Sequence, residues 1–325
     1  MPKVSVIIPV YGVDRYIERC AESLFNQTFD DIEYVFVNDC TKDKSIEVLE
    51  RVIEKYPNRK HNVKIVHHTI NKGLPFARKT GVSIASGDYI AHCDSDDWVD
   101  VQMYQLLYEK AKLENSDIVV CDYYRANDSY KERKKGLLST DKDKFLLDLM
   151  SHRFAWGVWN RLVRRSLYNQ VIFPKNNQAE DMALMIQLAY ISHKISYVEQ
   201  PLYYYFDNPA SMCKTRTCDE MVKSFNQVFA NISLLDSFFE SKEPDESILD
   251  CLLLIKLSAK NKLLPYIWQY NIYRLWRQSF SDINSKVLLS KSVSAVSKCK
   301  FLLTFLGFYS IIKFIQYKFK RVRTC

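Results

Sequence analysis

The sequence has little glycine and proline, with 7 Gly and 9 Pro among 325 residues, and it has no internal repeat. This scarcity argues against a collagen-like protein and against a long disordered linker. A glycine-rich phosphate-binding motif is also absent, because the first apolar run continues into Pro9-Val10-Tyr11. That absence argues against a P-loop nucleoside triphosphatase and against an NAD-dependent dehydrogenase. We therefore expect an ordinary globular chain of one large domain or two modest ones.

Acidic residues are missing from the chain after Val296, where seven basic residues occur. The whole chain carries a net charge of +8, so the part before Val296 carries only +1. A nearly neutral body argues against a nucleic-acid groove, and we predict no nucleic-acid partner. The basic end is typical of a chain that touches an anionic surface. Its basic residues are Lys298, Lys300, Lys313, Lys318, Lys320, Arg321 and Arg323.

A secretory signal is missing as well, because the apolar run in MPKVSVIIPVYG is too short for one. The nine cysteines are an odd number and are scattered along the chain, which is typical of reduced thiols. These two features predict a cytoplasmic protein.

Short β-branched runs alternate with helical periodicity in the first 125 residues. The predicted strands are Val4–Ile8, Glu33–Val37, Val63–His67, Tyr89–Cys93 and Asp117–Cys121. The predicted helices are Asp14–Asn26, Lys44–Tyr56, Leu74–Ala85 and Val99–Asn115. The alternation predicts an α/β fold with a mainly parallel sheet flanked by helices. Ligands of such sheets bind at the carboxyl ends of the strands.

The pattern changes after Asp122. A basic loop is predicted from about Arg125 to Lys135, then helices in KDKFLLDLM and AEDMALMIQLAYI, and a strand in KISYVEQPLYYYF. From about Thr217 the sequence is helical and rich in aromatic residues. We therefore divide the chain into residues 1–122, residues 123–215 and a helical C-terminal extension of residues 216–325.

The conspicuous polar clusters of the first part fall where predicted strands end. They are Pro9–Gly12, Asn38–Asp43, Asn71–Gly73 and Asp94–Asp97. Four strand ends of one sheet form one rim, so these clusters are expected to line one cleft. Taken alone, Asn38–Asp43 would more readily be a turn that caps the next helix.

The sequence Asp94-Ser95-Asp96-Asp97 places three carboxylates within four positions. Capping a helix near Trp98 needs only one of them, and Asp97 is the residue left for that role. Carboxylates packed together repel one another, which favours a bound cation. Mg²⁺ or Mn²⁺, held by one or two carboxylates and by substrate phosphates, matches this chemistry. Arg78 is expected to neutralise phosphate charge as well.

Three blocks of the sequence resemble the family 2 glycosyltransferases of GT-A fold. They are VSVIIPVYGVDRYIERCAESLFNQTFDDIEYVFVND, NKGLPFARKTGVSIASGDYIAHCDSDDW, and AEDMALMIQLAY with ISYVEQPLYYY, and together they cover about Lys3 to Ser211. The resemblance implies an inverting, metal-dependent transferase. Residues 1–122 would then bind the nucleotide-sugar, and residues 123–215 would bind the acceptor.

The resemblance also implies roles for individual residues. Pro9, Tyr11 and Asp39 would hold the nucleotide base, with Asp39 accepting the imide N–H of uracil, while Asn71, Gly73 and Arg78 would lie along the nucleotide and its diphosphate. In the Asp94-Ser95-Asp96 motif, Asp94 would approach the ribose and sugar, and Asp96 would bind the metal. Asp181, with Glu180 beside it, would be the general base; taken alone, this acidic pair would only favour the helix dipole.

The chain departs from the family pattern at two places. The family's DDGS motif reads Asn38-Asp39-Cys40-Thr41, so an amide replaces the first carboxylate and cysteine replaces the turn glycine. Lys79 stands where the family usually has asparagine. The first departure bears on the identity of the base, and the second places a charge near the phosphate edge.

The aromatic stretch FAWGVWNRLVRR matches the family's WNKL block, with Arg161 in place of lysine. Aromatic faces beside polar groups suit sugar stacking, so we assign Trp156, Trp159, Asn160 and Arg161 to the acceptor side. Two core tryptophans explain the same pattern equally well. Leu202–Phe206 is expected to be a core strand.

One apolar stripe is predicted in the C-terminal tail, formed by Phe301, Phe305, Phe308, Ile312, Ile315 and Phe319. Lys313 interrupts the stretch, which makes a weak transmembrane candidate. An interfacial helix on an anionic membrane fits better, and a helix docked on the body is the alternative. The first interpretation places the protein peripherally at the inner face of the plasma membrane.

The expected function is therefore transfer of a sugar, of hexosyl or N-acetylhexosaminyl type, from a nucleotide-diphosphate donor with UDP as the expected nucleotide. The expected acceptor is a hydroxyl of a glycan or of a lipid-linked oligosaccharide, in bacterial surface polysaccharide biosynthesis. A non-catalytic nucleotide-sugar-binding or scaffold subunit of the same fold is the alternative. A nucleotidyltransferase is a less favoured alternative. It would need acidic residues placed to hold two metal ions around a triphosphate, and this sequence offers one tight acidic cluster.

Overall fold

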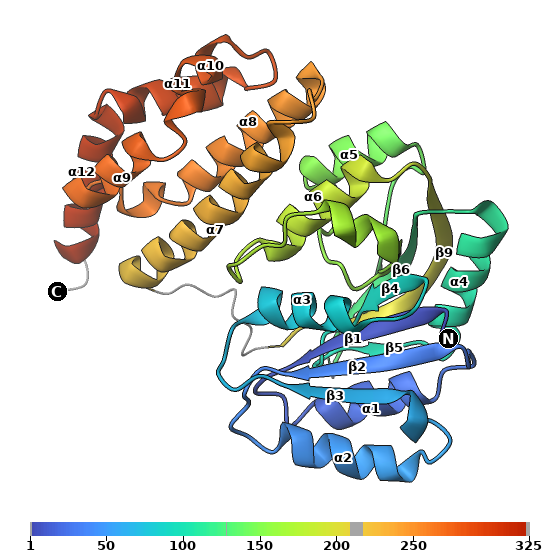
Figure 1. Cartoon of the computed structure of the whole chain (residues 1–325). Coiled ribbons are helices and arrows are strands. Elements are labelled where there is room, and N and C mark those ends of the chain that lie inside the picture. Colours follow the sequence, from blue (N-terminus) through green and yellow to red (C-terminus); the bar gives the residue numbers. More distant parts are fainter. Residues whose placement is uncertain (1, 128, 209–216, 323–325) are drawn as a thin grey trace. The chain divides into compact units, whose positions relative to one another are not determined.

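The computed structural model describes residues 2–127, 129–208 and 217–322, with side chains up to Tyr317. The chain forms two compact units, Met1–Ser211 and Met212–Cys325 (Figure 1). The division falls close to the expected start of the C-terminal extension at residue 216.

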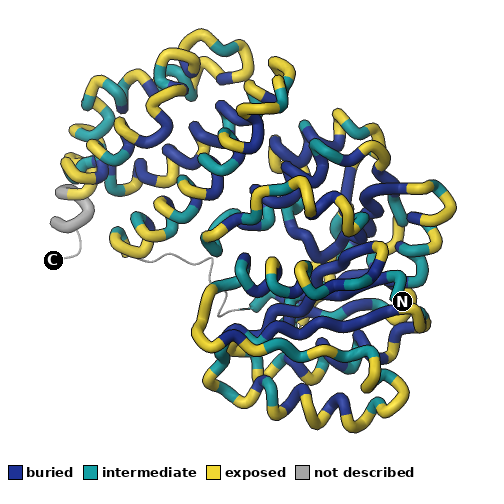
Figure 2. Tube along the Cα trace, viewed as in Figure 1, coloured by how far each residue is buried: buried dark blue, intermediate teal, exposed yellow. Residues whose placement is uncertain are grey.

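The first four strands form the parallel part of the sheet. They are β1 (Val4–Val10), β2 (Ile32–Asn38), β3 (Val63–His67) and β4 (Tyr89–His92), in the order β3-β2-β1-β4. Their residues are mostly β-branched or aromatic, and β1 is buried along its whole length (Figure 2). All four strands were expected within a few residues of these bounds.

Helices cover both faces of this part of the sheet (Figure 1). They are α1 (Ile17–Phe25), α2 (Ser45–Lys55) and α3 (Leu74–Ile84). Alternate β1 residues such as Val6 and Ile8 share one core with α1 and α2. Ile7 points to the opposite face, where its side chain fills the space that a Cβ at Gly81 of α3 would occupy. The prediction of an α/β fold with a sheet flanked by helices is confirmed.

Beyond β4 the sheet becomes mixed. Strand β8 (Arg161–Arg164) lies antiparallel between β4 and β6 (Ile118–Ala126), and β9 (Ile195–Phe206) runs parallel to β6. The basic loop predicted at residues 125–135 is instead a hairpin, in which β7 (Lys131–Lys134) pairs with β6. The helix expected from Val99 begins later: Trp98–Val99 form β5, which pairs with β9, and α4 spans Met103–Glu114.

The remaining helices of the first unit are α5 (Lys142–Met150) and α6 (Glu180–Ile191), both as expected. The 3-10 turns of the whole chain are η1 (Lys60–Asn62), η2 (Arg165–Gln170), η3 (Leu264–Tyr266) and η4 (Ser281–Ile283).

The second unit is helical, as predicted. Its helices are α7 (Cys218–Phe239), α8 (Glu246–Asn261), α9 (Tyr270–Gln278), α10 (Asn284–Leu289), α11 (Ala295–Phe305) and α12 (Phe308–Val322). Thr217 and Glu220 form a capping box at the start of α7, and Asp245 caps α8.

The tail predicted as one amphipathic helix is broken into α11 and α12. Gly307 has a φ of +87°, a left-handed conformation that a single continuous helix does not allow. The apolar stripe predicted for the tail is therefore divided between two helices. Phe301 of α11 is buried, whereas Phe308, Ile312 and Ile315 of α12 are exposed. The side chain of Phe319 lies outside the described residues. None of the described helices alone is long and apolar enough to cross a membrane; α11 and α12 meet that test only as a pair bent by 85°.

Candidate active site

The loops after β1 and β2 are tied together by side chains. The Gly12 amide donates to Thr41 Oγ1 at 2.9 Å, and the Asp14 amide donates to Asp43 Oδ2 at 3.0 Å. Pro9 lies inside β1 and is buried, whereas Tyr11 is 52% exposed directly after the strand. Of the two residues expected to hold the base, Tyr11 is the one presented to solvent.

Asp39 is held almost completely by the protein. Its carboxylate accepts the amides of Lys72 at 2.8 Å and Gly73 at 2.7 Å, and His68 Nδ1 lies 2.7 Å from Oδ1. The second ring nitrogen of His68 lies 2.9 Å from Thr80 Oγ1. Because Asp39 is only 3% exposed, it fixes the loop after β3 as well as the turn after β2.

The turn after β2 holds a cysteine in a backbone conformation that favours glycine. Cys40 has a φ of +59°, the left-handed conformation that the turn glycine would adopt without strain. Asn38 supports the turn, since its Oδ1 accepts the Thr41 amide at 2.9 Å. Cys40 therefore carries backbone strain that glycine would not.

The loop before α3 contacts the segment before α6. Asn177 Oδ1 accepts the Leu74 amide at 3.1 Å, and a Cβ at Gly73 would come within 2.6 Å of that oxygen. Gly73 also has a φ of +90°, so glycine is required here for conformation and for space. Asn71 is exposed on the same loop.

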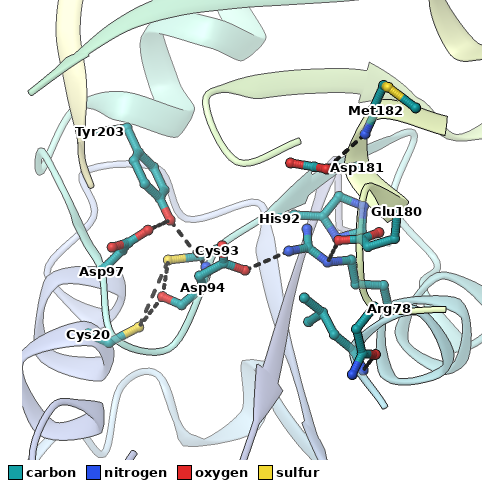
Figure 3. A network of polar contacts seen from close by, with 12 residues as sticks. Cys20, Arg78, His92, Cys93, Asp94, Asp97, Glu180, Asp181, Met182 and Tyr203 are labelled. Carbon is teal, nitrogen blue, oxygen red and sulfur yellow. Dashed lines mark hydrogen bonds and ion pairs between the residues drawn. The ribbon is translucent and has the colours of Figure 1, made fainter. Parts of the chain in front are cut away.

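Arg78 is buried and bridges two acidic motifs (Figure 3). Its Nη2 donates to Asp94 Oδ1 at 2.8 Å, and its Nε lies 3.2 Å from Glu180 Oε1. The side chain of Arg78 is 3% exposed. Among the described residues, neither Nε nor Nη1 has a hydrogen-bond partner, so the contact of Nε with Glu180 is an ion pair. Arg78 thus joins the end of β4 to the start of α6; its contact with a diphosphate stays a prediction.

The three carboxylates of the Asp94–Asp97 sequence have three different environments. Asp94 pairs with Arg78, and its amide donates to Tyr203 Oη at 3.1 Å. Asp96 Oδ2 accepts from Asn208 Nδ2 at 3.1 Å. Burial, and then the charge of Asp94, raises the pKa of Asp96.

Asp97 does not cap a helix, contrary to our expectation. It is 1% exposed and accepts from Tyr203 Oη at 2.6 Å and from the Phe206 amide at 2.7 Å, both on β9. Burial raises the pKa of Asp97 well above its usual range. The helix cap was the wrong interpretation because the carboxylate is needed to fasten this loop to a strand more than 100 residues away.

Glu180 and Asp181 begin α6 close to the Arg78 bridge (Figure 3). Glu180 is 2% exposed, and burial raises its pKa to about 8 although Arg78 opposes the shift. Burial also raises the pKa of the half-buried Asp181, again opposed by Arg78. Asp181 Oδ1 accepts the Met182 amide at 2.8 Å.

The residues assigned to the acceptor side lie deeper than that role requires. Trp159 is 6% exposed and stacks on Tyr203, with ring centroids 4.6 Å apart. Asn160 and Arg161 are fully buried, and Asn160 Nδ2 donates to the Cys121 carbonyl at 2.7 Å. Trp156 is half-buried and stacks on His152.

Packing in the protein core therefore accounts for Trp159, Asn160 and Arg161 better than direct contact with a sugar does. Burial lowers the pKa of Arg161 to about 10, and the nearby carboxylate of Asp181 opposes that shift. Arg161 thus lies close enough to Asp181 to influence its charge.

Among the described residues, no group of three or more His, Cys, Asp or Glu side chains is arranged to hold a metal ion. The carboxylates of Asp94 and Asp96 are the acids that the motif provides. This set suits a cation that also takes ligands from substrate phosphates. Burial and the charge of Asp94 raise the pKa of Asp96, and a cation bound there would favour its ionised form.

Four residues of this region were not anticipated: His68, Asn177, Tyr203 and Asn208. Each is distant in sequence from its partner in the site, so no local motif identifies it. Tyr203 lies in LYYYF, whose apolar character indicated only a core strand.

The family model named glycosyl transferase family 2 matches residues 5–177. The chain belongs to this family. It is 34% identical over 222 residues to the uncharacterized glycosyltransferase EpsJ of Bacillus subtilis, covering 65% of this chain and 63% of EpsJ. The chain therefore spans less than two thirds of the length of this relative.

Solved structures with low sequence identity support the fold. The complex of Staphylococcus aureus TarS 1–349 with UDP has a TM-score of 0.72 and 19% identity, covering 98% of this chain and 91% of that one. The mannosyltransferase PcManGT of Pyrobaculum calidifontis, solved with GDP-Man and Mn²⁺, has a TM-score of 0.54 and 13% identity, covering 97% and 86%. The expected GT-A fold is confirmed.

Proposed function

We propose that this chain transfers a sugar from a nucleotide-diphosphate donor to an acceptor hydroxyl, with inversion at the anomeric carbon. The observation that carries the proposal is the buried Arg78 bridge. It fixes the motif expected to bind donor and metal next to the first turn of α6, where the expected general base begins. Family membership and the UDP complex of TarS support the same function.

In the proposed reaction, Asp181 takes the proton of the acceptor hydroxyl. The hydroxyl oxygen then bonds to the anomeric carbon as the bond from that carbon to the phosphate oxygen breaks, and the nucleoside diphosphate leaves. General base catalysis of this kind contributes about 10²–10⁴-fold to a rate. Arg78 and Arg161 favour the ionised form of Asp181 that this step needs.

Asp96, with Asp94 beside it, is the proposed site of Mn²⁺ or Mg²⁺. Bound there, the metal would act as a Lewis acid for the charge that develops on the leaving phosphate. Asp96 Oδ2 accepts an N–H of the Asn208 side chain. The Mn²⁺ complex of PcManGT supports the use of a divalent ion in this fold.

A UDP-sugar is the proposed donor. Asp39 supports this choice because a carboxylate suits the imide N–H of uracil, although two backbone amides and His68 already bond to it. The acceptor we propose is a glycan or lipid-linked hydroxyl in surface polysaccharide assembly. We place the reaction in the cytoplasm, because the odd number and the scattering of the nine cysteines are typical of reduced thiols.

A panel of UDP- and GDP-sugars with Mn²⁺ tests the proposal. Wild-type protein should hydrolyse or transfer one donor, and Asp181→Asn should lose turnover by about 10²-fold or more while still binding UDP. Asp143→Asn, an exposed acid in the first turn of α5, is the matched control. Wild-type protein that binds UDP but never turns a donor over would instead establish the non-catalytic alternative.

A further inference from the structure

Helix α12 carries two apolar faces, of which only one is used for packing. Phe314 and Tyr317 lie against Trp268, with ring centroids 6.3 Å and 4.4 Å apart. These contacts fasten α12 within the second unit. They do not involve the residues on the other face of α12.

That other face consists of Phe308, Ile311, Ile312 and Ile315, which we name the α12 stripe. The spacing of three and four residues places them on one side of the helix. Their side chains are between 43% and 57% exposed. Leu306, just before the break at Gly307, is 58% exposed as well. Large exposed apolar patches of this kind mark interaction surfaces.

Positive charge gathers beside Tyr309, on the side of α12 that faces away from the α12 stripe. Lys300 of α11 and Lys313 of α12 both place Nζ 5.6 Å from the ring centroid of Tyr309, so two helices bring their charges to one place. No salt bridge among the described residues includes either lysine. The sequence adds Lys318, Lys320, Arg321 and Arg323 and no acidic residue.

We propose that the α12 stripe, with Lys300 and Lys313 on the other side of the helix, docks the protein on an anionic lipid membrane, with α12 lying in the plane of the interface. An apolar face immersed among acyl chains and a basic face turned toward the headgroups is the arrangement such helices use. A second copy of the chain is a poorer partner, because it would bring one basic tail against another. This proposal goes beyond glycosyl transfer and does not depend on it.

Sedimentation of the full chain with vesicles tests the proposal. Binding should be strong to phosphatidylcholine vesicles that contain about one third phosphatidylglycerol, and weak to phosphatidylcholine alone. It should also fall in about 1 M salt, where charges are screened within about 3 Å. Equal binding to the two kinds of vesicle would contradict the proposed role of the basic residues.

Variants separate the two parts of the surface. The double variant Ile311→Ser with Ile315→Ser should weaken vesicle binding at least about tenfold, because two large apolar side chains are lost. Lys313→Gln should weaken it about fivefold. Leu289→Ser, which removes an 82% exposed leucine on α10, and Lys262→Gln, on an exposed residue after α8, should leave binding unchanged.

Light scattering and circular dichroism complete the test. The double isoleucine variant should keep the wild-type mass and melting curve, so that lost binding cannot result from unfolding. Unchanged vesicle binding in this variant would overturn the proposal, and a drop from dimer to monomer mass would assign the stripe to self-association instead.

Discussion

The two compact units depart from ordinary globular proteins in opposite ways. Met1–Ser211 buries charge, since Arg78, Asp97 and Glu180 are at most 2% exposed. Met212–Cys325 exposes apolar surface in the α12 stripe. Both features cost free energy in water: buried charges lose hydration, and exposed apolar groups stay hydrated. The first feature fits the reaction site proposed for the first unit, and the second fits the membrane surface proposed for the second unit.

The largest effect is expected from removing the buried positive charge. Arg78→Met removes the partner of the buried Glu180 and of Asp94, whose side chain is 26% exposed, and should destabilise the first unit by about 3–5 kcal/mol. Turnover should fall with it, because burial would raise the pKa of Asp181 further without Arg78 to oppose it. Urea unfolding and donor turnover measure the two effects.

Lys79→Met is the matched control for this variant, since Lys79 is the next residue of α3 and is exposed. It should change the free energy of unfolding by less than about 0.5 kcal/mol. Equal effects of the two substitutions would mean that the bridge does not organise the site.

A smaller effect is expected from loosening the loop that carries the Asp94–Asp97 sequence. Asp97→Ala leaves the Tyr203 hydroxyl and the Phe206 amide without their acceptor, which should cost about 1–3 kcal/mol in total. UDP affinity in the presence of Mn²⁺ should fall as well. Asp88→Ala, at an exposed acid, is the control; a normal melting temperature for Asp97→Ala would refute the fastening role.

The smallest effect concerns backbone strain beside the site. Cys40→Gly should stabilise the protein by about 1 kcal/mol, because glycine adopts the φ of +59° without the clash of a Cβ. Asn115→Gly, at another left-handed residue, should gain less, since asparagine tolerates this conformation. Thermal unfolding compares the two, and destabilisation by Cys40→Gly would show that its thiol makes a needed contact.

Local patterns were sufficient to predict most of the first unit. The β-branched strands and amphipathic helices follow from periodicity, and the positions of the polar clusters follow from the rule for parallel strand ends. Tyr11, Asp39 and Asp94 accordingly lie on the loops where they were expected. The α6 helix, with Glu180 and Asp181 in its first turn, was also visible from its apolar spacing.

Long-range partners could not be predicted in the same way. Asp97 satisfies the signature of a helix cap, and only its bonds to β9 show that it fastens a loop. Strand β8 enters between β4 and β6 through a pairing that no single segment encodes. In the tail, the apolar spacing runs through Gly307, so the spacing alone does not reveal the break that its positive φ makes.

The pH dependence of donor turnover in two variants tests the central claim most directly. At neutral pH, Asp181→Asn should be nearly inactive, whereas Glu180→Gln should keep most of the activity, because a glutamate with a pKa of about 8 is largely protonated there. Wild-type turnover should rise with pH as Asp181 ionises, and change again near pH 8 as Glu180 ionises. The second change should be absent in Glu180→Gln. Full turnover by Asp181→Asn, with Glu180→Gln inactive, would contradict the assignment of the base.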